Sequence, residues 1–236
     1  MDDRERRLEM SSALVLQTQN NRPPGLLGDW ATARMVELDV LRVDRWEQLP
    51  DPADYSFAVV LGSDESVVGQ PTGWVARLVR WIGRADGAGL PVLGICFGAQ
   101  ALATALGGCA IRLQTPEQAW IELGRRDSEW VPAGPWLALH EDAIVLPASA
   151  RELARNDFGP QAFTIGGHLG VQFHPEVTPS ILAGWLADQD GLVSSKLLIG
   201  VAERCRLAAV GALRLFDGFI GREWSGSRFA VSPGII

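Results

Sequence analysis

Short apolar runs alternate with segments of helical periodicity along the first half of the chain. Four runs are rich in β-branched and aliphatic residues, as buried parallel strands are, and they cover residues 13–16, 40–43, 57–61 and 91–95. Between them, apolar side chains recur every three or four positions, which predicts helices of about twelve residues from Leu26, at 74–84 and at 98–106. This alternation predicts an α/β fold with a mostly parallel, twisted sheet flanked by helices. Its active site is expected at the carboxyl ends of the strands.

After Gly108 the pattern changes to short strand-like runs separated by Pro, Gly and charged residues. These runs predict an antiparallel extension of the sheet, and they cover residues 109–113, 120–123, 136–140, 143–146, 162–165 and 170–173. A helix is predicted at 179–187, and an amphipathic stretch at 196–219. We therefore expect a charged tail at 1–10, one α/β domain at 11–190, and a helical extension at 191–236 that packs on the same domain. Docking of this extension to another protein is the alternative.

Composition and charge narrow the class of protein. Apolar residues make up 47% of the chain and charged residues 21%, which is typical of a globular protein. The formal net charge of −7 offers no basic surface, so neither nucleic acid nor a membrane is an expected partner. Three cysteines without a CxxC pair indicate a reducing compartment. Because no apolar run is long enough for a membrane span and the N-terminus lacks a signal-peptide core, the sequence predicts a cytoplasmic location.

The sequence predicts no metal and no cofactor. No cluster of His, Cys and Asp has the spacing of metal ligands, and neither a GxxxxGK[ST] nor a GxGxxG phosphate loop is present. The chain therefore shows no visible means of activating an acceptor with ATP.

Cys96 lies on the hinge between the strand predicted at 91–95 and the helix predicted at 98–106. A strand that breaks sharply into a helix presents the hinge side chain, and the positive end of the helix dipole favours a thiolate there. Gly94, Gly98 and Ala99 supply the small neighbours that such a crowded turn needs. These features favour a nucleophile, and the alternative is a buried structural cysteine on an ordinary turn.

A second motif, His174-Pro175-Glu176, follows another predicted strand. A cysteine nucleophile needs a base, and the base needs a partner that holds its ring. Residues two apart on an extended segment point to the same side, so His174 and Glu176 can face one site. Pro175 restricts His174 to extended geometry.

Together, GICFGAQ around Cys96 and HPE at His174 resemble the class I (triad) glutamine amidotransferases, over residues 13–186. The turn at 62–66 is similar to that of the glutaminase domain of GMP synthases. This resemblance implies a flavodoxin-like fold and a Cys-His-Glu triad. Cys96 would attack the side-chain amide carbon of glutamine to form a thioester, His174 would move the protons, and Glu176 would orient the ring.

The resemblance also assigns the groups around the triad. The backbone N–H of Phe97 and that of Ser63, in the turn that begins at Gly62, would form the oxyanion hole. Ser63 stands where a second glycine is common, and a positive φ there would cost of order 1 kcal/mol or more. Substrate binding falls to three residues: Gly62, Gln100 and Glu141. For Gln100 the alternative is an ordinary polar helix residue.

Other polar residues and cysteines are weaker candidates for the functional site. His140-Glu141-Asp142 lies where the family places main-chain contacts to the amino-acid end of the substrate, and a simple turn is the alternative. His168 is expected in a turn, and Cys109 and Cys205 are expected to be packing residues.

Three functions remain open on the sequence alone. The first is a glutaminase subunit that hydrolyses L-glutamine and delivers ammonia to a synthetase on another chain. The second is a free-standing hydrolase of γ-glutamyl amides or peptides. The third is a catalytically silent homologue with a regulatory role, against which the complete set of Cys96, His174 and Glu176 argues.

Overall fold

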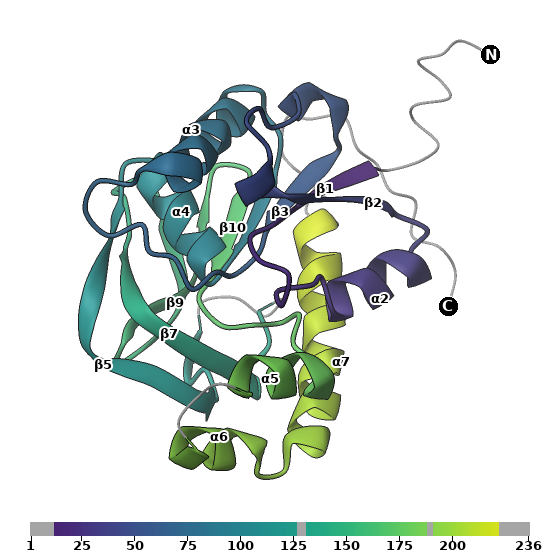
Figure 1. Cartoon of the computed structure of the whole chain (residues 1–236), viewed down its shortest axis with the longest axis vertical. Helices are drawn as coiled ribbons and strands as arrows, with labels where there is room; N and C mark the ends of the chain where they lie inside the picture. Colours follow the sequence, from purple (N-terminus) through teal and green to yellow (C-terminus); the bar gives the residue numbers. More distant parts are fainter. Residues whose placement is uncertain (1–11, 127–130, 188–190, 222–236) are drawn as a thin grey trace.

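The main sheet of the computed structural model has eight strands and places five parallel strands beside three antiparallel ones (Figure 1). The structure describes residues 12–126, 131–187 and 191–221, so the tail expected at 1–10 lies outside the described residues. From one edge to the other, the strands are β2 (Glu37–Arg42), β1 (Ser12–Gln17), β3 (Phe57–Val60), β4 (Val92–Ile95), β10 (His168–Val171), β9 (Gly159–Ile165), β8 (Arg151–Asn156) and β6 (Arg125–Arg126). In this order, each pair of neighbours from β2 through β1, β3 and β4 to β10 is parallel. The pairs β10 with β9, β9 with β8, and β8 with β6 are antiparallel. The predicted α/β fold with a mostly parallel sheet and an antiparallel extension is confirmed.

Alternate residues of the central strands build two hydrophobic cores, one on each face of the sheet. Ala13 and Val15 of β1 join the core under α2 (Leu26–Ala33) and α7 (Val201–Ile220), where Trp30 and Phe216 are buried. Leu14 and Leu16 join the opposite core, under α3 (Gly73–Gly87) and α4 (Phe97–Ala105). Side chains on a strand point alternately to its two faces, so a continuous apolar run buries both. Two short 3-10 helices, Val43–Arg45 and Pro52–Asp54, lie in the connection from β2 to β3.

A separate antiparallel pair, β5 (Cys109–Ile121) with β7 (Trp136–Val145), lies beside the main sheet, and helices α5 (Pro179–Leu186) and α6 (Gly191–Leu198) lie at one end of it (Figure 1). Leu137 of β7 packs with Leu182, Trp185 and Leu197 in a third apolar cluster. The indole N–H of Trp120 donates to the carbonyl of Leu197 at 2.9 Å. These contacts bring α5 and α6 close to the segment that carries His174.

Several predicted boundaries are wrong, and each has a local cause. The helix from Leu26 is eight residues long, because Met35 takes a left-handed φ of 54° and ends the turn. The runs at 109–113 and 120–123 form one strand, since the break around Pro116 is a shift of register between Arg112 and Glu117 rather than a turn. The runs at 136–140 and 143–146 likewise form the single strand β7, so the polar residues 140–142 are part of a strand.

The C-terminal region also differs from its prediction. The amphipathic stretch expected at 196–219 consists of two helices, α6 and α7, because Gly200 lies between them with a φ of 64°. Strands β6 and β8 were not predicted from the apolar pattern. Their sequences are rich in Arg and Glu, and they lie at the edge of the sheet.

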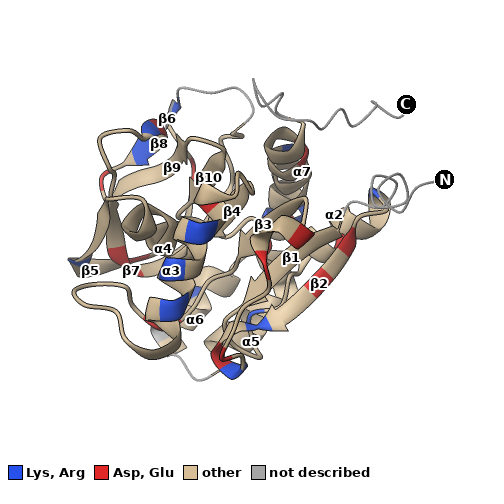
Figure 2. Cartoon of the chain, turned by 90° about the horizontal axis from the view of Figure 1, so that it is seen from above, with Lys and Arg blue, Asp and Glu red and all other residues tan. Residues whose placement is uncertain are grey.

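Charged side chains are distributed over both sides of the molecule. Figure 2 shows basic residues along α3 and acidic residues along β2. Of the helices in the described part of the chain, none combines the length and the apolar character that a membrane span requires.

Candidate active site

Cys96 lies on a strained elbow between β4 and α4. Its φ is 52° and its ψ is −110°, and it is one of two non-glycine residues with positive φ in the described part of the chain. Such a conformation costs of order 1–3 kcal/mol and persists only where the surroundings impose it. The backbone N–H of Cys96 donates to the carbonyl of Val171 at 2.8 Å, which fastens the elbow to β10. The side chain is buried, with 5% of the residue exposed.

Two glycines make the elbow possible through close approach of the backbone. A Cβ atom on Gly94 would lie 2.5 Å from the carbonyl oxygen of Gly98. A Cβ atom on Gly98 would lie 2.1 Å from the carbonyl oxygen of Val60 on β3. Helix α4 therefore begins in direct contact with the sheet, and its first N–H group, that of Phe97, lies beside the sulfur-bearing residue.

His174 and Glu176 form a buried hydrogen-bonded pair. The Nδ1 atom of His174 lies 2.7 Å from Oε1 of Glu176, and the two side chains are 0% and 2% exposed. The backbone N–H of His174 donates to the carbonyl of Leu137 at 2.9 Å, and the edge of the ring contacts Trp185, with ring centroids 4.8 Å apart. The Nε2 atom has no hydrogen-bond partner among the described residues. One ring nitrogen is thus held, and the other is available.

The charge environment favours a protonated His174. Burial by itself lowers the pKa of this imidazole, but the negative charges of Glu176 and the Cys96 thiolate raise it further than burial lowers it. The net result raises the pKa of His174 from 6.5 to about 10. A protonated imidazole beside the sulfur can give a proton to a leaving group, as a general acid does.

The turn that begins at Gly62 closes over both groups. A Cβ atom on Gly62 would lie 3.0 Å from Cε1 of His174 and 3.8 Å from Cβ of Cys96, so a side chain at this position would press against the His174 ring. The hydroxyl of Thr18 donates to the carbonyl of Gly62. Because a trans peptide directs its N–H opposite to its C=O, this bond also fixes the direction of the Ser63 N–H.

Side chains from the loop after β1 hold the rest of this turn. The Gln19 amide donates to Oδ2 of Asp64 and accepts from the Asp64 N–H, both at 2.9 Å. Arg22 pairs with the same carboxylate and stacks over Trp185 at 4.2 Å. Ser63, for which a positive φ would have been strained, does not have one. The backbone strain of this site lies at Cys96 instead.

The predicted substrate-binding residues lie in different environments. Gln100 is 3% exposed, and its amide donates to the carbonyl of Asp142 at 3.1 Å and to the side chain of Gln172 at 3.3 Å. The side chain of Glu141 is exposed and pairs with Arg112. Only the main chain of Glu141 can therefore face the interior.

The weaker candidates have identifiable structural roles. His168 is the first residue of β10 and is buried, with Nδ1 accepting from the Val92 N–H at 3.1 Å and Nε2 3.0 Å from Asp86. Its assignment to a turn is therefore wrong. Cys205 is buried in α7, as predicted, and burial raises the pKa of its thiol. Cys109 is exposed, so its assignment to packing is wrong.

Sequence reasoning missed four residues around the site: Gln172, Trp185, Thr18 and Glu117. Only Gln172 had a usable signal, since it lies two positions before His174 in a stretch whose predicted strand would direct both side chains to the same side. The other three reach the site through long-range contacts. Among residues 12–126, 131–187 and 191–221, no three His, Cys, Asp or Glu side chains are grouped so that they could hold a metal ion.

Solved structures share this fold. A glutamine amidotransferase from Methylobacillus flagellatus matches with a TM-score of 0.79 and 21% identity, over 91% of this chain and 95% of that one. A glutamine amidotransferase from Thermotoga maritima matches with a TM-score of 0.77 and 23% identity, over 89% of this chain and 98% of that one. At these identities the likeness establishes the fold alone.

Sequence comparison adds relatives and a family. A GMP synthase [glutamine-hydrolyzing] from Nitrosomonas eutropha is 34% identical over 117 residues, which are 43% of this chain and 22% of that protein. The corresponding protein of Thermomicrobium roseum is 41% identical over 97 residues, which are 38% of this chain and 18% of that protein. The chain thus spans about a fifth of the length of these curated relatives. The family model described as glutamine amidotransferase class-I matches residues 66–188, more than half of the chain, and the chain belongs to this family.

Proposed function

We propose that this chain hydrolyses the side-chain amide of L-glutamine through a thioester on Cys96 and supplies the ammonia to a synthetase on a separate chain. The observation that carries the proposal is the buried His174–Glu176 pair beside Cys96. One ring nitrogen is held at 2.7 Å by the carboxylate, and the other has no partner among the described residues. The name of the matched relatives, GMP synthase [glutamine-hydrolyzing], supports glutamine as the substrate.

The proposed reaction has two steps, formation of the thioester and its hydrolysis. The Cys96 thiolate attacks the amide carbon, and the protonated His174 transfers its proton to the departing nitrogen, which leaves as ammonia. The neutral His174 then takes a proton from water, the resulting hydroxide attacks the thioester, and glutamate leaves as the thiolate is restored. Glu176 keeps Nδ1 protonated and the ring oriented in both steps.

Backbone donors stabilise the charge that develops on the amide oxygen. Phe97, which provides one N–H, is the first residue of α4. The direction of the Ser63 N–H is fixed by the hydrogen bond from the Thr18 hydroxyl to the Gly62 carbonyl. Donors fixed before the reaction need no reorganisation in the transition state, and removing one such donor costs about 10²–10³ in kcat in other enzymes. Gln100 and the main chain of Glu141 remain our predicted contacts to the substrate.

The length of the matched relatives supports a second activity outside the matched region. The chain spans about a fifth of those proteins, so an activity that uses ammonia has to come from a region that this chain does not match. All three cysteines are free thiols, which supports the predicted reducing, cytoplasmic location.

An electrophilic glutamine analogue tests the proposal. We expect it to alkylate Cys96 and to spare Cys109 and Cys205, because only Cys96 has a neighbouring base. Cys96→Ala should abolish glutamine hydrolysis and keep a cooperative thermal transition. His174→Ala should lose about 10³-fold or more in rate, and Glu176→Gln less, since a glutamine still accepts from Nδ1.

The matched control is Cys109→Ser, which changes an exposed thiol outside the site and should leave the rate unchanged. Labelling of Cys109 or Cys205 with Cys96 intact, or near-wild-type hydrolysis by His174→Ala, would contradict the proposed nucleophile and base. Faster hydrolysis of γ-glutamyl amides than of glutamine would favour the free-standing hydrolase.

A further inference from the structure

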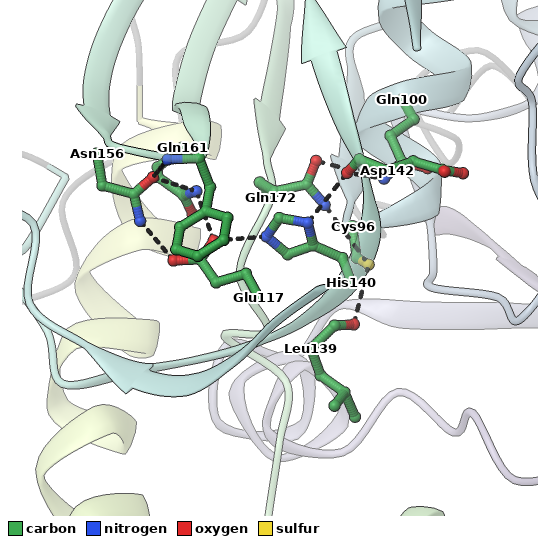
Figure 3. Close-up of polar contacts among 10 residues, drawn as sticks. Cys96, Gln100, Glu117, Leu139, His140, Asp142, Asn156, Gln161 and Gln172 are labelled. Atoms are coloured by element: carbon green, nitrogen blue, oxygen red, sulfur yellow. Dashed lines mark hydrogen bonds and ion pairs between the residues drawn. The ribbon is translucent and has the colours of Figure 1, made fainter. Parts of the chain in front are cut away.

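A line of buried polar side chains runs from β5 to the nucleophile, and of its members only Gln100 has a role in the function proposed above (Figure 3). Four of its members, Glu117, His140, Gln100 and Gln172, are between 1% and 6% exposed. Burying so many polar groups is unfavourable unless each finds a partner. Here each of the four does, and the last contact in the line is to sulfur.

The amide of Gln172 faces Cys96 with its donor side. Its Nε2 lies 3.7 Å from the Cys96 sulfur, and its Oε1 accepts from the Gln100 amide at 3.3 Å. The Gln100 contact fixes the orientation, because Gln172 can accept only through its oxygen and must then present its NH₂ group to the sulfur. Gln172 is therefore a hydrogen-bond donor to whichever form of the sulfur is present, and the ionised form binds a donor more strongly.

Gln100 is oriented in turn by β7. Its Nε2 also donates to the carbonyl of Asp142 at 3.1 Å, and Nδ1 of His140 lies 3.0 Å from the same oxygen. Since a carbonyl can only accept, Nδ1 of His140 carries hydrogen. The Nε2 atom lies 2.7 Å from Oε2 of Glu117, so a shared proton must lie between these two atoms. The pair thus fixes the ring and the carbonyl that Gln100 uses.

The far end of the line is anchored by two more amides. Asn156 donates to Oε1 of Glu117 at 2.5 Å, and Gln161 donates to Oε2 at 3.0 Å. The carbonyl of Gln161 also accepts from the backbone N–H of Gln172 at 2.9 Å. Gln172 is therefore held at its backbone and at its side chain by the same cluster.

We propose that Gln172 is a further catalytic residue that stabilises the Cys96 thiolate by a hydrogen bond, and that the buried Glu117–His140 pair is a positioning unit acting through Gln100. This inference rests on the proposed function, in which Cys96 is the nucleophile. His174, backed by Glu176, supplies the positive charge beside the sulfur, and Gln172 supplies a neutral donor. A thiolate in a buried site without such donors would be strongly disfavoured.

The test is the pH dependence of Cys96 alkylation by iodoacetamide, which reads the thiolate directly and does not require glutamine hydrolysis. Gln172→Met keeps the length of the side chain and removes the donor. Hydrogen bonds to charged groups contribute about 1.5–3 kcal/mol, so we expect the midpoint of the alkylation profile to rise by about one pH unit or more. The control is Gln114→Met, the same change at an exposed position of β5, which should leave the midpoint unchanged.

The positioning unit is tested by a pair of substitutions at His140. His140→Leu removes the Nδ1 donor and should raise the midpoint by a smaller amount than Gln172→Met. His140→Asn places an amide N–H near the position of Nδ1 and should restore most of the wild-type profile. If Gln172→Met does not fold, Gln172→Glu replaces the donor with an acceptor in the same space and should raise the midpoint at least as far.

Two results would overturn the inference: an unchanged midpoint in a folded Gln172 variant, or equal midpoints for His140→Leu and His140→Asn. A purely structural role would lower the melting temperature of these variants and leave the midpoint where it is. Failure of the proposed function looks different. In that case the wild-type Cys96 would not be labelled by the glutamine analogue, although the alkylation midpoint would still depend on Gln172.

Discussion

At the scale of the residue, the site concentrates strain and buried charge on a few side chains. Cys96 takes a φ of 52°, and the His174–Glu176 pair is almost completely buried. Both features cost free energy in the folded state unless the neighbours compensate. Two hydrogen bonds supply this compensation. One joins the backbone N–H of Cys96 to the carbonyl of Val171, and the other joins His174 to Glu176 at 2.7 Å.

The raised pKa of His174 predicts how stability depends on pH. Its value rises from 6.5 to about 10 on folding, so the stabilisation is fully present below pH 6.5 and is lost as the pH rises through 10. We expect the free energy of unfolding of the wild type, measured with urea, to fall between pH 6.5 and 10. The fall should be smaller in His174→Gln, which cannot take up the proton. Parallel curves for the two proteins would show that His174 does not keep its proton in the folded state.

The three residues of the proposed triad could be singled out from the sequence because they lie in two short, local motifs, and their catalytic roles stay a prediction. Cys96 needs only its strand-to-helix hinge, and His174 and Glu176 are two residues apart in sequence. Pro175 and Glu176 form a turn rather than the predicted extended segment, but the two side chains still meet. Glu117 and His140 could not be predicted in the same way, since they meet only through the pairing of β5 with β7. Gln172 and Gln100 likewise meet only because β10 lies beside β4.

At the scale of the element, local pattern was sufficient for β1, β3, β4 and α3, which are central and strongly apolar. It was insufficient where tertiary pairing decides the outcome. The polar stretch 140–142 looks like a turn by itself, but cross-strand bonds to β5 extend it into one strand. The helix break at Gly200 was missed for a related reason, because the apolar positions of α6 and α7 continue the same periodicity across the break.

Helix α7 provides a prediction about the extent of the folded unit. Phe216 is 1% exposed and packs against Trp30, with ring centroids 5.9 Å apart, so the helix shares the core of the main sheet. We expect Phe216→Ala to lower the free energy of unfolding by about 3–5 kcal/mol, as large-to-small changes in cores do. Leu213→Ala is the control, since Leu213 lies on the same helix and is 40% exposed. Urea unfolding of both variants provides the measurement, and equal small losses would show that residues from 191 onward do not belong to the α/β domain.

At the scale of the whole molecule, the active site is nearly closed. Cys96 is 5% exposed and His174 0%, and the turn at Gly62 lies directly over both. The proposed substrate, glutamine, would therefore have to displace part of the protein to reach the sulfur. Candidates are the turn at 62–66, which the loop after β1 holds by side-chain bonds, and Trp185, which lies on α5 against the His174 ring.

This closure leads to our last prediction, that the chain by itself is a poor glutaminase and that a synthetase partner activates it. An enzyme that released ammonia without a consumer would waste glutamine, and the region matched by the relatives is only a fifth of their length. A partner that binds near α5 or the turn at 62–66 and favours an open site would raise the rate in proportion to the open fraction. We expect the purified chain to turn over glutamine far below the ~10 s⁻¹ typical of enzymes, and to accelerate when the synthetase is added. The measurement is ammonia release by the chain alone, by the chain with the synthetase, and by Cys96→Ala with the synthetase as the background. A turnover near that typical value from the isolated chain would reject activation by a partner, because the closed site would then open without help.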